Sequence, residues 1–176
     1  MKIRLSNPLQ SDSIVDGEGI RAVIWTQGCP HHCKGCHNPE THSFTKGFFK
    51  DTSELIEEIR NLELQDGITF SGGDPMMQPE ACLEIAKACK EMNLNIWCYT
   101  GFTFEELLDD PLKVEFLKYI DVLVDGKFEL DKKSYDAMYR GSTNQRIINV
   151  KESLKKRKCV TIRKYKKRQP VTINLF

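Results

Sequence analysis

The chain has almost no net charge and no long apolar run, and each of these absences excludes a class of partner. Its 176 residues carry 26 Lys and Arg against 25 Asp and Glu, for a formal net charge of +1 at pH 7. A nearly neutral chain lacks the field that attracts nucleic acid, so we expect no nucleic-acid partner. No apolar run approaches the roughly 20 residues of a membrane-spanning helix, and residues 1–8 lack the apolar stretch of a signal peptide. We expect a cytoplasmic protein with no membrane partner.

A disulfide framework is also missing. The 7 cysteines are an odd number, and only one group of them is regularly spaced. The hydrophobic fraction of 40% and the charged fraction of 29% are typical of a soluble globular protein. A chain of this length can bury one substantial core, so we expect a single domain.

Apolar, β-branched runs alternate with helical patterns along most of the chain. Helix 51–61 is expected to begin with a capping box of Asp51 and Glu54, and helix 103–118, broken at Pro111, with one of Thr103 and Glu106. Residues 146–150 could form one more strand. The alternation predicts an α/β fold with parallel strands and right-handed crossovers. The expected strands are residues 21–26, 68–70, 94–99 and 120–124, and another helix begins at Pro79.

Each predicted strand ends in a polar or glycine-containing loop. In parallel α/β folds ligands bind at the carboxyl ends of the strands. We therefore expect four loops to share one edge of the sheet: the loop after residue 26, residues 71–75, residues 99–101 and residues 125–127.

The first of these loops contains Cys29, Cys33 and Cys36 in the spacing CxxxCxxC. Three thiolates can hold three corners of a [4Fe-4S] cluster and leave the fourth iron open to a small molecule. A structural zinc site of three cysteines and one histidine is the alternative, since His31, His32, His37 and His42 are close in sequence. We interpret His31, His32 and His42 as polar loop residues rather than ligands.

The second loop, residues 71–75, reads Ser-Gly-Gly-Asp-Pro. Gly72 and Gly73 let backbone groups approach a ligand closely, and Asp74 could accept from an ammonium group. The string alone is also typical of a tight turn. The weaker candidates are Tyr99 and Thr100, which could line the cavity, and Asp125 and Lys127, which could contact a carboxylate or a cation. Cys82, Cys89 and Cys98 read as buried apolar residues, and Cys159 has no assigned role.

Together these motifs resemble the radical S-adenosylmethionine superfamily. The resemblance implies a partial (β/α) barrel in which Cys29, Cys33 and Cys36 hold a [4Fe-4S] cluster whose open iron binds S-adenosylmethionine. It implies that residues 72–74 contact the methionine amino group. Many members carry an aromatic residue where this chain has Gly35, and His37 is expected beside the adenine instead. Gly35, Cys36 and His37 thus join Gly72, Gly73 and Asp74 as the expected cofactor-binding residues.

Within that superfamily the chain is similar to the small glycyl-radical activases of anaerobic ribonucleoside-triphosphate reductase. The similarity includes residues 14–21, 67–75, 97–102, 122–128 and 140–146. It implies reductive cleavage of S-adenosylmethionine to a 5′-deoxyadenosyl radical, which removes a hydrogen from a glycine of the large reductase subunit. An external one-electron donor such as reduced flavodoxin is implied as well.

The similarity covers residues 1–150, which we predict to be the core domain, followed by a basic extension at 151–176. Glu18 stands where these activases often have proline, and the extension is longer than their pattern. Three alternatives remain open at this stage. The chain could activate another glycyl-radical enzyme, act on a small molecule like 7-carboxy-7-deazaguanine synthase, or be a zinc-stabilised module that binds nucleic acid.

Overall fold

The computed structural model describes residues 1–165, which form one mixed α/β unit around an eight-stranded sheet. The strands are β1 (Lys2–Leu5), β2 (Gln10–Ser13), β3 (Arg21–Thr26), β4 (Phe48–Asp51), β5 (Gly67–Gly72), β6 (Asn95–Tyr99), β7 (Val122–Asp125) and β8 (Arg146–Asn149). The α-helices are α1 (Thr52–Arg60), α2 (Pro79–Glu91), α3 (Phe104–Leu107), α4 (Pro111–Leu117) and α5 (Val150–Lys156). Short 3-10 helices lie at Pro39–His42, Pro75–Met77, Leu130–Lys132 and Arg163–Tyr165.

The centre of the sheet is parallel, as the alternation of strands and helices predicts. Its order is β4-β1-β3-β5-β6-β7-β8, and β2 also pairs with β3. Strands β3, β5, β6 and β7 run parallel to their neighbours in that group, whereas β1, β2, β4 and β8 pair antiparallel. The antiparallel strands β1, β2 and β4 are absent from the sequence-based prediction.

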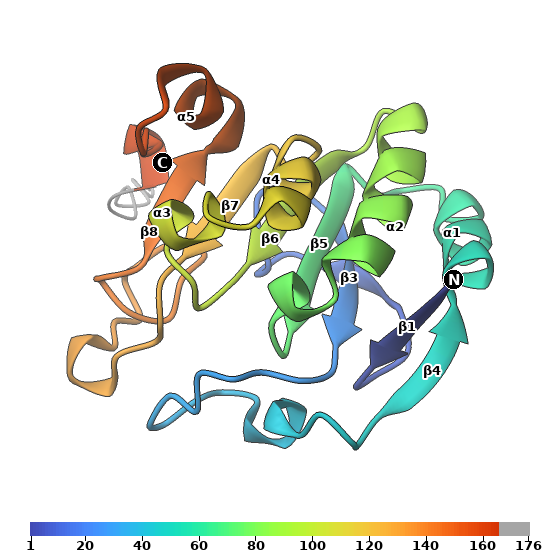
Figure 1. The fold of residues 1–176 in the computed structure, drawn as a ribbon, viewed down its shortest axis with the longest axis horizontal. Coiled ribbons are helices and arrows are strands. Elements are labelled where there is room, and N and C mark those ends of the chain that lie inside the picture. The colour runs from blue at the N-terminus through green and yellow to red at the C-terminus, as the bar shows by residue number, and fades with distance from the viewer. Residues whose placement is uncertain (166–176) are drawn as a thin grey trace, which may run out of the picture.

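Helices α1, α2 and α4 cover one face of the sheet (Figure 1). Alternate strand residues such as Ile68, Phe70 and Leu123 point into the core between these helices and the sheet, and all three are fully buried. Cys82, Cys89 and Cys98 belong to the same core, which confirms their interpretation as buried apolar residues. Cys159 is half-buried at its border.

The opposite face of the sheet has a smaller core, in which aromatic side chains pack with Val122, Val124 and Ile147. Trp97, Tyr139 and Tyr165, which we call the aromatic cluster, pack edge-on with ring centroids 5.4–5.5 Å apart. Tyr165 comes from residues 160–165, here called the C-terminal strap. The strap runs along the free edge of β8, where the Ile162 amide donates to the Ile147 carbonyl. The strap therefore places the Tyr165 ring against Trp97, on the face that the helices leave open.

Two local predictions can be checked directly. The capping box of Thr103 and Glu106 is confirmed at the start of α3. The capping box of Asp51 and Glu54 is wrong, because the Asp51 side chain makes no capping hydrogen bond. Asp51 instead ends strand β4 and pairs with Lys2, and the first amide of α1 donates to the Met1 carbonyl.

Part of the predicted basic extension lies in the structure. Residues 151–156 belong to α5, and residues 160–165 form the strap. Residues 166–176, including the end of the basic run 163–168, lie outside the described residues. Within residues 1–165, no helix combines the length and apolar character needed to cross a membrane.

Candidate functional site

The three cysteines of the CxxxCxxC motif line a single small cavity at the carboxyl edge of the parallel strands. The cavity has a volume of about 120 Å³. The loops after β3, β5, β6 and β7 all contribute to its wall, as predicted: the last three supply Gly72 and Gly73, Tyr99 to Gly101, and Gly126. Parallel pairing of β3 with β5, in the register Thr26 to Gly72, brings the cysteine loop beside the glycine loop.

The backbone fixes the glycine loop directly against the cysteine loop. The Gly73 amide donates to the Thr26 carbonyl at 2.7 Å, and the Asp74 amide to the Gly28 carbonyl at 2.8 Å. A Cβ atom on Gly73 would lie 2.5 Å from the Gly28 oxygen. The contact therefore requires glycine at this position.

The three cysteines are half-buried. The Asn38 amide donates to the Cys36 sulfur at 3.4 Å, and the His31 backbone favours the thiolate form of Cys29 and so lowers its pKa against the effect of burial. Burial raises the pKa of Cys29 to about 11 and raises the pKa of Cys36 as well. Without a metal these two are neutral thiols at pH 7, so metal binding must release their protons.

Asp74 is fully buried. The sequence predicts that its carboxylate contacts an ammonium group, but in the structure this carboxylate accepts hydrogen bonds from other residues of the protein. Its carboxylate accepts from the Met76 and Gly101 amides, the Thr100 hydroxyl and the His31 imidazole, at 2.7–3.0 Å. Thus Asp74 joins the loops after β3, β5 and β6.

Other sequence candidates also have partners within the protein. Asp125 is buried, accepts from the Phe104 amide at 2.7 Å and forms an ion pair with Arg146. The Tyr99 hydroxyl donates to the Tyr139 carbonyl at 2.8 Å. Lys127 is exposed, and its side chain is absent from the wall of the cysteine cavity.

Residues 126–145 form a further wall of the site that the sequence motifs did not reveal. The His37 ring packs against Phe128 with centroids 5.0 Å apart, and Leu130 lies over Gly35. Gln145 lines the cavity and holds this segment together: it accepts from the Gly141 amide and donates to the Gly126 carbonyl. Residues 140–146 are one of the stretches that carry the family resemblance. Their place beside the site becomes visible only from their contacts in the structure.

A family model described as "4Fe-4S single cluster domain" matches residues 15–148. The chain is 36% identical over 144 residues to the anaerobic ribonucleoside-triphosphate reductase-activating protein of Pasteurella multocida, covering 76% of this chain and 90% of that protein. The proteins of the same name from Vibrio cholerae and Escherichia coli K12 are 38% and 33% identical, over 76% and 78% of this chain and 90% and 94% of theirs.

The chain belongs to the family of anaerobic ribonucleoside-triphosphate reductase-activating proteins. The matched domain contains Cys29, Cys33 and Cys36 and places a 4Fe-4S cluster, rather than structural zinc, in the family's chemistry. Three thiols on one cavity wall, with a backbone of glycine opposite them, suit such a cluster.

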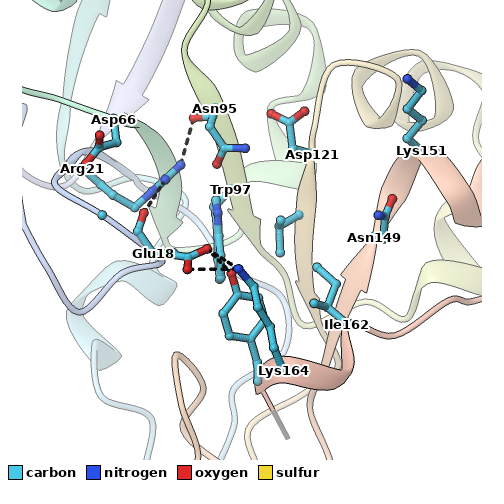
Figure 2. Close-up of a pocket in the computed structure, with 13 residues that line it drawn as sticks. Glu18, Arg21, Asp66, Asn95, Trp97, Asp121, Asn149, Lys151, Ile162 and Lys164 are labelled. Carbon is cyan, nitrogen blue, oxygen red and sulfur yellow. Dashed lines mark hydrogen bonds and ion pairs between the residues drawn. The ribbon is translucent and has the colours of Figure 1, made fainter.

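A second and larger cavity, of about 730 Å³, lies at the opposite edge of the sheet, beside the amino ends of β3, β5 and β6 (Figure 2). Arg21 and Trp97 line it, and Glu18, Lys164 and Tyr165 meet at its side. Arg21 is buried and donates to the Thr69 hydroxyl and to the Glu18, Ile68 and Asn95 carbonyls. Burial lowers its pKa to about 10, so it stays charged at pH 7. None of the described residues that line this cavity is a cysteine.

Proposed function

We propose that this chain generates a glycyl radical on anaerobic ribonucleoside-triphosphate reductase as a radical S-adenosylmethionine enzyme. The observation that carries the proposal is the single cavity wall formed by Cys29, Cys33 and Cys36, within a chain of this activating-protein family. Three cysteine ligands leave one iron of a [4Fe-4S] cluster without a protein ligand. That position suits the amino and carboxylate groups of S-adenosylmethionine.

When bound, the cluster would supply one electron to the sulfonium of S-adenosylmethionine, giving methionine and a 5′-deoxyadenosyl radical. The chain's own residues orient the reactants and exclude water. No side-chain acid or base is required, so the cluster ligands are the only residues to which we assign a chemical role.

The cofactor contacts are proposed for the residues around the same wall. Gly72 and Gly73 would offer backbone groups to the methionine part, since the Asp74 carboxylate already accepts from four groups of the chain. Asp74 would then act by holding the loop in place. Gly35, Cys36 and His37 would lie toward the adenine, on the side closed by Phe128 and Leu130.

The proposed partners are the large reductase subunit, which holds the target glycine, and an external one-electron donor such as reduced flavodoxin. The names of the relatives point to the reductase. We further propose that residues 1–150 form the radical core and residues 151–176 a basic C-terminal extension. The family model, which ends at residue 148, supports this division.

The test is reconstitution without oxygen. The protein is loaded with iron and sulfide, and iron is counted before dithionite and S-adenosylmethionine are added. We expect about four irons per chain, release of 5′-deoxyadenosine, and a glycyl radical signal by electron paramagnetic resonance when the large reductase subunit is present. A Cys33→Ala variant is the control and should yield neither product.

Each failure has its own meaning. One tightly bound zinc and no nucleoside product would refute the radical mechanism. Formation of 5′-deoxyadenosine without a signal on the reductase, but with one on another glycyl-radical enzyme, would refute the choice of partner.

A further inference from the structure

His31 lies inside the cluster motif, between Cys29 and Cys33, yet its side chain contacts a different loop. Its Nε2 atom lies 2.7 Å from the Asp74 carboxylate, and both side chains are nearly inaccessible, at 6% and 0% exposure. The imidazole also stands edge-on to Phe102, with centroids 4.5 Å apart. The interpretation of His31 as one polar loop residue among others is therefore incomplete.

The packing around the ring is tight. A Cβ atom on Gly101 would lie 2.3 Å from the imidazole, so the ring rests directly against the backbone of the loop after β6. This arrangement fixes the orientation of His31 from two sides: Gly101 and Phe102 on the loop after β6, and Asp74 on the loop after β5. We call the contact between His31 and Asp74 the latch.

Asp74 depends on this contact. A carboxylate with no exposed surface is costly unless hydrogen bonds and charge compensate it. Its other donors are the Met76 and Gly101 amides and the Thr100 hydroxyl, all neutral. Among the described residues that contact the carboxylate, His31 is the one side chain able to carry a positive charge.

The latch lies beside a cluster ligand. Only Pro30 separates His31 from Cys29 in the chain. The nitrogen of His31, the sulfur of Cys29 and an oxygen of Asp74 all lie within 4.8 Å of one another. The short segment from Cys29 to His31 therefore couples the latch to the position of the Cys29 sulfur.

We propose that His31 is a positioning residue of the cluster site. Its latch to Asp74 holds in place the part of the cysteine loop that contains Cys29, and thereby sets how tightly the cluster is retained. This inference rests on the proposed function. Groups that orient metal ligands from outside the coordination sphere commonly change metal retention by 10–100-fold when removed. Hydrogen bonds to ligand sulfurs also tune the reduction potential. His31 acts through Asp74 and Cys29 and does not itself bind iron.

The neighbouring histidine supplies a matched control. His32 stands in the same loop, is exposed and adopts a left-handed backbone with φ of 48°. Asparagine tolerates that backbone, so His31→Asn and His32→Asn are the same chemical change at adjacent positions. Asparagine is too short to place a donor where Nε2 of His31 stands, whereas glutamine can reach it, so His31→Gln is the rescue variant.

The first measurement is iron loss from reconstituted protein to a chelator under anaerobic conditions, with a potentiometric titration of the cluster signal. His31→Asn should still take up about four irons but lose them roughly 10-fold faster or more, and its reduction potential should shift. His31→Gln should fall within about threefold of the wild type, and His32→Asn should match it. Equal loss rates and potentials in His31→Asn and His32→Asn would overturn the latch. So would uptake of only about three irons by His31→Asn, because that result would make His31 a ligand.

The second measurement uses protein without iron, so that the two proposals can fail separately. Amide hydrogen exchange should be faster at residues 100–102 in His31→Asn than in the wild type or in His32→Asn. If the wild type binds no cluster, the proposed function fails, and the exchange result alone decides whether the latch exists. Unchanged exchange in His31→Asn would refute it.

Discussion

Removal of the Tyr165 side chain tests whether the C-terminal strap is part of the fold. Tyr165 is 5% exposed, its ring lies 5.5 Å from those of Trp97 and Tyr139, and its hydroxyl donates to Glu18. Replacing a fully buried aromatic residue by alanine typically costs about 3–5 kcal/mol. Tyr165 borders the large open cavity, where water can fill the vacated space, so we expect a loss of about 2–3 kcal/mol for Tyr165→Ala.

Thermal unfolding followed by circular dichroism measures this loss. In a protein of this size 1 kcal/mol corresponds to about 2–4 °C, so Tyr165→Ala should melt about 4–12 °C below the wild type. Tyr165→Phe removes only the hydroxyl, and Glu18 keeps its ion pair with Lys164. We expect this variant to lose no more than about 1 kcal/mol.

Tyr135 provides the control, since its side chain is 81% exposed. Tyr135→Ala should change stability by less than about 0.5 kcal/mol. The reasoning would be refuted if Tyr165→Ala melted within about 1 °C of Tyr135→Ala. That result would mean that the strap does not pack against the aromatic cluster.

Three further predictions concern other contacts. The hydrogen bond from Lys164 lowers the pKa of Glu18 below its usual 4.5, so this contact stabilises the fold fully above that value and is lost as the pH falls through the lowered pKa. The near-ultraviolet circular dichroism of the aromatic cluster should report the loss as the pH is lowered from 4.5, and a spectrum that stays unchanged until the whole protein unfolds would contradict it. Asp125→Asn should lower the urea unfolding free energy by about 1–3 kcal/mol, because Arg146 loses a buried charged acceptor while it keeps its contact with Glu105; a change below about 0.5 kcal/mol would assign Asp125 no structural role. Gly73→Ala, whose Cβ would lie 2.5 Å from a backbone oxygen of the cysteine loop, should cost about 1–3 kcal/mol and reduce the iron retained after reconstitution. Wild-type stability and iron content would show that the two loops can separate freely.

The parallel centre of the sheet was predictable because each of its strands is a short apolar run followed by a glycine-containing loop. Strand β3, with the sequence RAVIWT, is nearly all buried, and buried parallel strands read as continuous apolar runs. Strand β2 has the sequence QSDS, and β4 is mostly exposed. Strands β2 and β4 form because strands elsewhere in the sequence pair with them. Such pairing cannot be predicted from the residues of the strand itself.

At the site, too, local features were predictable from the sequence and long-range contacts were not. The spacing of Cys29, Cys33 and Cys36 is local, so the sequence alone predicts that they lie together, and the shared cavity confirms it. His31 and Asp74 are separated by 43 positions. Their contact depends on the register of β3 against β5 and on the conformation of both loops, neither of which a motif contains.

Two features singled out in the sequence meet in the structure. The resemblance implies proline at the position of Glu18, and the described C-terminal strap lies beyond residue 148, where the match to the family model ends. The Glu18 carboxylate accepts from Lys164 and from the Tyr165 hydroxyl, 147 positions further along the chain. Proline could provide no such acceptor. The carboxylate and the strap form one unit, which joins the edge of β8 to the loop before β3 at the side of the sheet opposite the cysteines. Loss of the strap would therefore expose Trp97 and Tyr139, which pack against the Tyr165 ring, and loss of the Glu18 carboxylate would remove the acceptor that joins the strap to the loop before β3.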